Sequence, residues 1–418
     1  MKSRDKPGLI DYIDITIDTQ IIMAYNNNNY SSNNPFHQNM QNNYAPPSGP
    51  PPQGMNPQYQ NYNPPPGPPP ENYQQYPPPQ YQTQQQQYYP PPQQGMGPGG
   101  MGPMGAQGMG FGYDANGDAA AIVKATKGFG TDEKALIRIL APRTPSEIDA
   151  LKLAFDQVKG KSLRQVIEKE TSGNFRDCLL QIIAGPLGAD VDNVHRAVDG
   201  AGTNESMLND VLLGRTNQEL NLLKGTYRQR YGRPLEKDVA DDLSMKTLKL
   251  FNIVTAATRM EEWIPVDPAR VSRDVEDLYR ATQDRGSTDE MVVCAILANR
   301  SDSHIRELAN QYHRRYNKKL VAVIENEFSG HMKKALLYIV KLAVNRPTCC
   351  AEMLEDCMAG MGTKDKLLVE RIVRYHWDKA LMADIKAAYR TVYGRELMVR
   401  VRGETSGDYQ RLLLAILA

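Results

Sequence analysis

Two features recur at a fixed distance within residues 118–418: a Gly-rich loop that ends in Thr, and an acidic residue farther along the chain. The loops span 126–131, 198–203, 282–288 and 358–363, and the acids are Glu170, Asp242, Glu327 and Glu404. The last loop residue and its acid are 39 residues apart in three cases (170 − 131, 242 − 203, 327 − 288) and 41 in the fourth (404 − 363). This spacing indicates four copies of one unit, with a period of about seventy residues.

The residue types at these positions suit a hard cation. Paired glycines allow a loop to turn sharply and to point its carbonyl oxygens inward. Carbonyl oxygens together with a bidentate carboxylate are the ligands that Ca²⁺ prefers. The acid at the end of a later helix would add its carboxylate to the coordination shell of the ion. A coordination position left open could then accept a lipid phosphate. The pattern therefore predicts a site at which calcium and a membrane bind together.

Other interpretations of the loop are weaker. A single Gly-x-Gly-Thr is more often an ordinary turn between helices. A nucleotide phosphate loop requires a Lys after its last Gly and a preceding strand, and these loops have neither. An EF-hand requires alternating acids, which are also missing. The matched acid in every repeat favours a metal.

The elements that must position these residues are helices. In the first repeat, Ala121, Ile122 and Ala125 precede the loop at helical spacing, and residues 135–140 form a second apolar stripe. Thr131 is placed to cap the helix that follows the loop. The segments 144–147 and 216–219 have the pattern of a capping box. We therefore expect an all-α array with five helices per repeat, over residues 118–185, 186–258, 270–343 and 344–418, with a linker at 259–269.

The composition divides the chain in two. Residues 1–117 are rich in Asn, Gln, Pro, Tyr and Gly and are predicted to be a disordered tail, since they bury too little apolar surface to order. Met23 is an alternative start, with residues 1–22 interpreted either as an extension or as an artefact of the assigned start. The core has 46 basic residues (49 − 3) against 42 acidic ones (48 − 6), too mild a balance to argue for nucleic acid.

Five cysteines without a framework spacing fit a reducing compartment. No stretch is long and apolar enough to span a membrane.

Residues 118–418 resemble four annexin repeats. The resemblance rests on the serial motif Gly-x-Gly-Thr-[Asp/Asn]-Glu with its distant acid, as in 128–133 and 200–205. The tail is similar to those of annexins VII and XI and of fungal annexins. The resemblance implies a slightly curved disc of four five-helix domains. It places the calcium loops on the convex face, with the termini and the tail on the concave side.

The resemblance also implies the ligands of each calcium site. The principal sites are Thr126, Gly128, Gly130 and Glu170 in repeat one; Val198, Gly200, Gly202 and Asp242 in repeat two; and Met358, Gly360, Gly362 and Glu404 in repeat four. The minor sites are Thr131 with Glu133, Thr203 with Glu205, and Thr288 with Glu290, while repeat four has Asp365 at the equivalent position.

The repeats depart from this pattern to different degrees. Repeat three has one extra loop residue, Arg285 where flexibility is wanted and Ser287 for the second Gly, so the Glu327 site is expected to be weak or rearranged. Repeat four has a two-residue insertion, expected within 374–382. The residue between the two glycines should lie at the loop tip and face the bilayer. Those residues are Phe129, Ala201 and Met361. Phe and Met predict that repeats one and four dominate membrane attachment.

The expected function is non-enzymatic: calcium-dependent binding to anionic phospholipid membranes, in trafficking, aggregation or repair. Such a protein is cytoplasmic and becomes peripheral to the membrane in calcium. No arrangement of the six histidines suggests catalysis. The alternative is a scaffold whose tail forms condensates, self-associates or binds partners, with the helical core as a membrane anchor. A core without a basic and aromatic stacking pattern argues against RNA.

Overall fold

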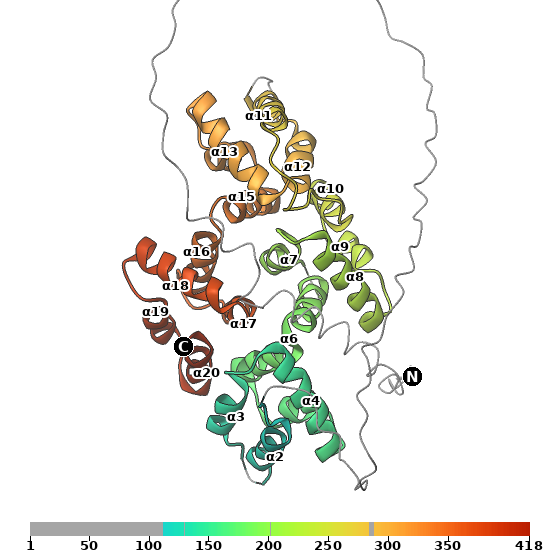
Figure 1. Cartoon of the computed structure of the whole chain (residues 1–418), viewed down its shortest axis with the longest axis vertical. Coiled ribbons are helices and arrows are strands. Elements are labelled where there is room, and N and C mark those ends of the chain that lie inside the picture. Colours follow the sequence, from blue (N-terminus) through green and yellow to red (C-terminus); the bar gives the residue numbers. More distant parts are fainter. Residues whose placement is uncertain (1–111, 129, 201, 284–287) are drawn as a thin grey trace, which may run out of the picture. The chain divides into compact units, whose positions relative to one another are not determined.

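The structure is a computed structural model that describes residues 112–128, 130–200, 202–283 and 288–418. All regular elements within these ranges are α-helices, as the sequence predicts (Figure 1). The predicted tail lies outside the described residues except for positions 112–117. Helix α2 begins at Ala115, three residues before the expected start of repeat one, because the Asp114 side chain caps it by accepting from the Gly117 amide.

Repeats one and two share one long helix. Repeat one comprises α2 (Ala115–Ala125), α3 (Glu133–Leu140), α4 (Pro145–Lys159), α5 (Leu163–Glu170) and the first part of α6 (Gly173–Val198). Repeat two comprises the rest of α6, α7 (Glu205–Leu212), α8 (Asn217–Tyr231), α9 (Leu235–Asp242) and α10 (Met245–Thr255). Within α6 the backbone leaves helical geometry at Gly185 (φ 70°, ψ 175°), followed by Pro186. Proline lacks an amide donor, so the kink separates two helices at the expected repeat boundary.

Repeats three and four follow the same plan. Repeat three comprises α11 (Pro268–Gln283), α12 (Glu290–Asn299), α13 (Asp302–Tyr316), α14 (Leu320–Glu327) and α15 (Gly330–Val344). Repeat four comprises α16 (Arg346–Met358), α17 (Asp365–His376), α18 (Lys379–Tyr393), α19 (Leu397–Glu404) and α20 (Gly407–Leu417). Helix α11 begins two residues inside the predicted linker, and α15 ends at the first residue assigned to repeat four. Helix α17, where the insertion is expected to begin, has 12 residues, while the equivalent helices α3, α7 and α12 have 8, 8 and 10.

The helix starts test the predicted caps. Both capping boxes are confirmed: the Thr144 amide donates to Glu147 (2.8 Å), and the Thr216 amide donates to Glu219 (2.8 Å). The cap expected at Thr131 is wrong. Asp132 caps α3 instead, because its carboxylate accepts from the Ala135 amide (3.0 Å) and its charge faces the positive end of the helix.

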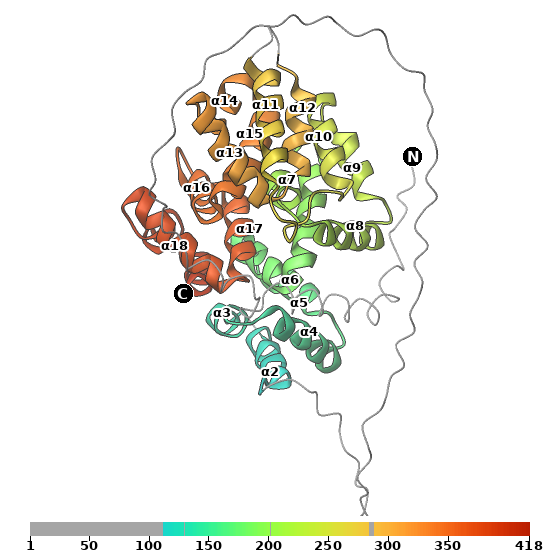
Figure 2. The ribbon, with the colours of Figure 1, turned by 45° about the horizontal axis from the view of Figure 1, so that its top comes forward.

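Apolar contacts join the repeats into one unit over residues 112–418. Helix α20 of repeat four packs on α3 and α6 (Figure 1), and α17 packs on α6 and α7 (Figure 1 and Figure 2). Helices α10 and α15 join repeats two and three through α12 and α7. A single buried cluster extends through all four repeats. Within the described residues, no helix has both the length and the hydropathy needed to cross a bilayer.

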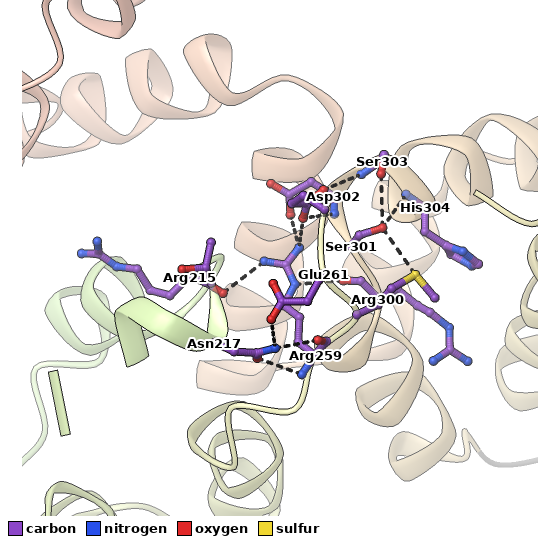
Figure 3. Close-up of polar contacts among 12 residues, drawn as sticks. Arg215, Asn217, Arg259, Glu261, Arg300, Ser301, Asp302, Ser303 and His304 are labelled. Carbon is purple, nitrogen blue, oxygen red and sulfur yellow. Dashed lines mark hydrogen bonds and ion pairs between the residues drawn. The ribbon is translucent and has the colours of Figure 1, made fainter. Parts of the chain in front are cut away.

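The linker is held by one arginine. Arg259 donates to the carbonyl oxygens of Arg215 (3.2 Å) and Arg300 (3.1 Å) and pairs with Asp302 (2.5 Å), and its own backbone bonds the Asn217 side chain (Figure 3). These contacts tie the helix starts of repeats two and three together, so the connection acts as a fixed joint.

Candidate metal centre

Each Gly-rich loop is closed by the same backbone hydrogen bond. The amide just after the loop donates to a carbonyl in the last turn of the preceding helix. The four bonds are Asp132 to Ala125 (2.9 Å), Asn204 to Ala197 (2.8 Å), Asp289 to Ala281 (2.8 Å) and Lys364 to Cys357 (2.8 Å). Repeat three spans eight positions where the others span seven, so its extra residue is contained within the closed loop.

The glycines are required by the backbone. In repeat one, Gly128 and Gly130 have positive φ angles of 112° and 85°. Residues with a side chain are strained at such angles, whereas glycine is not. A Cβ added at either position would meet nothing, so conformation rather than space excludes other residues. The pairs in repeats two and four have the same sign of φ: Gly200 and Gly202 (137°, 92°), Gly360 and Gly362 (94°, 87°). The loop geometry expected from the sequence is therefore present in these three repeats.

The four acids occupy one structural position. Each is the last residue of an eight-residue helix: Glu170 of α5, Asp242 of α9, Glu327 of α14 and Glu404 of α19. The C-terminal end of a helix carries partial negative charge, so a carboxylate there is disfavoured by about 0.3–1 kcal/mol unless a positive group compensates it. All four acids therefore lie where a nearby positive group would stabilise them.

The loop threonine brings loop and acid together. Its hydroxyl donates to the backbone carbonyl of the acid in repeat one (Thr131 to Glu170, 2.8 Å) and in repeat two (Thr203 to Asp242, 3.0 Å). In repeat four Thr363 bonds the Glu404 carbonyl (3.4 Å) and its carboxylate (3.1 Å). In repeat three Thr288 bonds the Glu327 carboxylate (2.7 Å). The 39-residue spacing thus corresponds to a direct contact.

The donor set fits a hard cation best in repeats one and two. The Oδ2 atom of Asp242 is buried and has no hydrogen-bond partner among the described residues. A buried carboxylate oxygen left unbonded is costly, so this oxygen is free to accept from a donor or to contact a cation. Among the described residues no three His, Cys, Asp or Glu side chains lie close enough to hold a metal. Each Gly-rich loop therefore has one acidic side chain from the distant helix beside it.

The other acids have partners of their own. The only cation on Glu170 in the described part is Lys169 (3.2 Å), whose side chain is 82% exposed and therefore strongly hydrated. Glu327 is bonded by Thr288 and by the Gln283 amide (3.4 Å), while residues 284–287 of its loop lie outside the described residues. Glu404 pairs with Arg400.

The acids of the minor sites differ in the same way. Glu205 pairs with Lys334 (3.2 Å) and Glu290 pairs with Lys246 (2.8 Å), so both minor acids contact a neighbouring repeat. No ion pair is found for Glu133 within the described ranges. Asp365 lies in the first turn of α17.

The loop tips are described only in part. Met361 is fully exposed, as expected for a side chain that faces a membrane. Phe129 and Ala201 lie outside the described residues, so their predicted membrane contacts stay predictions.

Two polar features were not foreseen from the sequence. One is Arg400, which lies four residues before Glu404 on α19. The other is a buried ionic cluster, in which Asp190 on α6 pairs with Arg215 and Arg374, and Asp210 on α7 pairs with Arg371 (2.6 Å). The pairing of Arg215 with Asp190 in repeat two recurs as Arg143 with Asp118 in repeat one and as Arg300 with Asp274 in repeat three. It is therefore a structural ion pair common to these three repeats.

A cavity of about 10 Å³ lies beside this cluster, lined by α6 and α17. It holds at most one water. Burial raises the pKa of the neighbouring Glu370 to about 7, although Arg374 opposes the shift. This cluster lies between repeats and offers no room for a substrate, so the loops remain the candidate site.

Comparison with known proteins supports the repeat assignment. The annexin family model matches residues 117–182, 189–251, 273–339 and 350–416. The chain is similar to annexin C1 of Cryptococcus neoformans, with 42% identity over 73% of this chain and 66% of that protein. It is also similar to annexin A4 of Rattus norvegicus, with 37% identity over 73% of this chain and 95% of that protein. Annexin A7 of Dictyostelium discoideum has 37% identity over 73% of this chain and 65% of that protein. It therefore spans about two-thirds of the longer relatives.

Solved structures show the same arrangement. Annexin III matches with a TM-score of 0.71 at 30% identity, over 73% of this chain and 94% of that one. The calcium-bound structure of annexin (Sm)1 matches with a TM-score of 0.64 at 28% identity, over 73% and 90%.

Proposed function

The chain belongs to the annexin family, and on that basis we propose that it binds anionic phospholipid membranes in a calcium-dependent manner. The family model covers all four repeats, and the family fold is present over residues 112–418. The role is one of binding, without catalysis of a reaction.

One observation carries the proposal. In all four repeats a loop threonine bonds the acid at the end of a distant helix, which brings the Gly-rich loop next to that acid. In repeats one and two this carboxylate lacks a strong internal cation. Bound calcium would supply the missing positive charge and leave a coordination position for a lipid phosphate.

The residues of the chain then have distinct roles. The glycines hold the loop open toward the ion, the threonine fixes the loop to the acid, and the acid neutralises charge. In repeat one the proposed ligands are the carbonyls of Thr126, Gly128 and Gly130 with the Glu170 carboxylate. The Thr126 hydroxyl donates to the Ile122 carbonyl (2.9 Å), which anchors the start of the loop to α2. Val198, Gly200, Gly202 and Asp242 take the same roles in repeat two.

We further propose that this binding serves membrane trafficking, aggregation or repair. The protein would be cytoplasmic at low calcium and peripheral to a membrane at high calcium. Tail-binding proteins or self-association of the tail would then add partners to those of the core.

Vesicle pelleting tests the proposed lipid class. The full chain is mixed at saturating calcium with vesicles of phosphatidylserine and phosphatidylcholine, or of phosphatidylcholine alone. We expect the protein to pellet with the anionic vesicles only. Equal pelleting with both would contradict an anionic headgroup as the partner.

A further inference from the structure

An arginine side chain contacts the candidate calcium ligands of repeat four. Arg400 lies one helical turn before Glu404 on α19, so both side chains are on the same face. Its Nη1 pairs with the Glu404 carboxylate, and its Nη2 donates to the carbonyl oxygen of Met358, the first residue of the loop. These are two of the oxygens that the resemblance assigns to calcium. The guanidinium therefore lies where a cation bound by both would lie.

A third contact holds the arginine in place. Its Nε donates to Glu355 on α16 (3.3 Å), and Glu355 is itself bonded by Arg395 (2.9 Å) and by the Tyr389 hydroxyl. All three nitrogens of the Arg400 guanidinium are thus engaged, and its side chain is only 16% exposed. Charge-assisted hydrogen bonds with this little exposure are stronger than an ordinary surface ion pair.

The arrangement is specific to repeat four. The residue four before the acid is Val166 in repeat one, Asp238 in repeat two and Val323 in repeat three. The residue equivalent to Glu355, three before the loop, is Val123, His195 or Tyr279. In repeat two the position of Arg400 holds an acid in place of a base. That acid, Asp238, accepts from Tyr227 (2.8 Å) and pairs with Arg233. In the described part of the chain, only repeat four has a cationic side chain that bonds both the loop acid and a loop carbonyl oxygen.

We propose that Arg400 is an internal substitute for calcium in repeat four. The fourth loop is held to its acid without the metal, and calcium binds there only by displacing the guanidinium. This inference rests on the proposed function and assigns a regulatory residue within it. Repeat four then contributes the exposed Met361 to a membrane, while repeats one and two supply the calcium response. The ranking expected from the sequence, with repeats one and four together, changes accordingly.

Calorimetric calcium titration without lipid tests the inference. The background is the full chain with E170Q, D242N and E327Q, in which Glu404 is the last of the four loop acids. Adding R400M removes the guanidinium but keeps a long side chain. We expect R400M to lower the calcium Kd of this background by about tenfold or more, a change of about 1.4 kcal/mol. Adding E404Q should abolish that gain.

The matched control is R402M. Arg402 lies on the same helix, is exposed and is equally charged, so its loss alters net charge without opening the loop. Thermal unfolding in chelator gives a second readout: R400M should lower the Tm, and calcium should restore it, whereas R402M should show neither effect. If R400M does not fold, R400Q carries the same test.

The outcomes separate the two proposals. If R400M binds calcium no more tightly than its background, while the intact chain binds calcium and loses affinity with E170Q, only the role of Arg400 is wrong. If the intact chain binds no calcium at all, the proposed function fails and the inference fails with it.

Discussion

At the scale of single residues, four equivalent carboxylates have four different surroundings. Among the described residues, the Glu170 carboxylate pairs with an exposed lysine, Asp242 has a buried oxygen without a partner, Glu327 is bonded by neutral groups, and Glu404 pairs with an arginine. Each acid lies at the C-terminal end of its helix, which carries partial negative charge. How strongly a bound cation would stabilise it therefore depends on the positive groups that already lie near it. We therefore expect the four repeats to differ in how strongly they bind calcium.

The acids should differ when they are neutralised one at a time. Because Glu170 has no buried partner, E170Q should raise the calcium needed for half-maximal vesicle binding by about tenfold, as expected for losing about 1.4 kcal/mol. E327Q should change it by less than about threefold. Titrating pelleting against calcium for both variants measures this. A larger effect of E327Q would show that the extra residue of repeat three builds a working loop of another shape.

The threonine that joins loop to acid should matter for affinity more than for folding. T131V removes the bond to the Glu170 carbonyl at nearly constant shape, at a cost of about 1 kcal/mol. We expect the calcium requirement to rise about fivefold. T391V removes a comparable hydroxyl bond, from Thr391 to Ala387 on α18, far from any loop, and should leave the requirement unchanged. Equal effects of the two substitutions would contradict the assigned role.

Sequence reasoning reached the loop and the acid but missed Arg400. The loop and acid were predictable because their spacing recurs, and recurrence is visible without a structure. Arg400 and Glu404 appear in sequence as an ordinary ion pair one turn apart. Only the packing of α16 against α19 brings the Met358 carbonyl to the same guanidinium, and a contact between distant helices has no local signal.

At the scale of helices, the predictable features are those set locally. The spacing of apolar residues predicted the helices, and a capping box predicted the start of α4. The cap of α3 was misassigned because Thr and Asp are adjacent and both can cap, and tertiary contact with Glu170 decides which one does. Helix α17 is the longest of its equivalents and ends at His376, which contacts the last helix.

His376 should make stability depend on pH. Burial lowers its pKa to about 4, although a bond to the Ile416 carbonyl (3.1 Å) partly opposes the shift. Between pH 6.5 and 4 the unfolded chain binds a proton that the folded chain does not, so stability falls as pH falls. The slope approaches about 1.4 kcal/mol per pH unit. H376Q should remove this contribution, as measured by urea unfolding at pH 7.5, 6 and 5.

The exposed His313 provides the control for this slope. H313Q should leave the pH dependence as it is in the unmodified protein. A pH slope that is unchanged in H376Q would mean that other groups set it.

At the scale of the whole molecule, the repeats form one packed unit whose first helix begins earlier than the composition suggested. Tyr113 bonds Asp118 (2.9 Å) and stacks under Arg143, and Asp114 caps α2. The composition changes near residue 117, but capping and stacking by single residues do not alter composition. The boundary between tail and core therefore could not be placed from residue content alone.

Two truncations should separate the tail from the core. Deleting residues 1–111 should preserve folding and calcium-dependent binding, because the helices retain their caps, and should reduce self-association. Deleting residues 1–117 also removes Tyr113 and the cap at Asp114, at a cost of about 0.5–2 kcal/mol for the cap. It should lower the Tm by thermal scanning. Identical Tm values for both truncations would contradict the boundary at α2.

The central claim is that the loops and their acids hold a calcium ion that joins the chain to anionic lipid. The most direct measurement pellets the full chain with phosphatidylserine vesicles in calcium, adds excess chelator to the same sample, and compares the E170Q/D242N variant. We expect binding in calcium, complete release by chelator, and a large loss of binding in the variant at intermediate calcium. Equal pelleting of the unmodified chain before and after chelation would contradict the account.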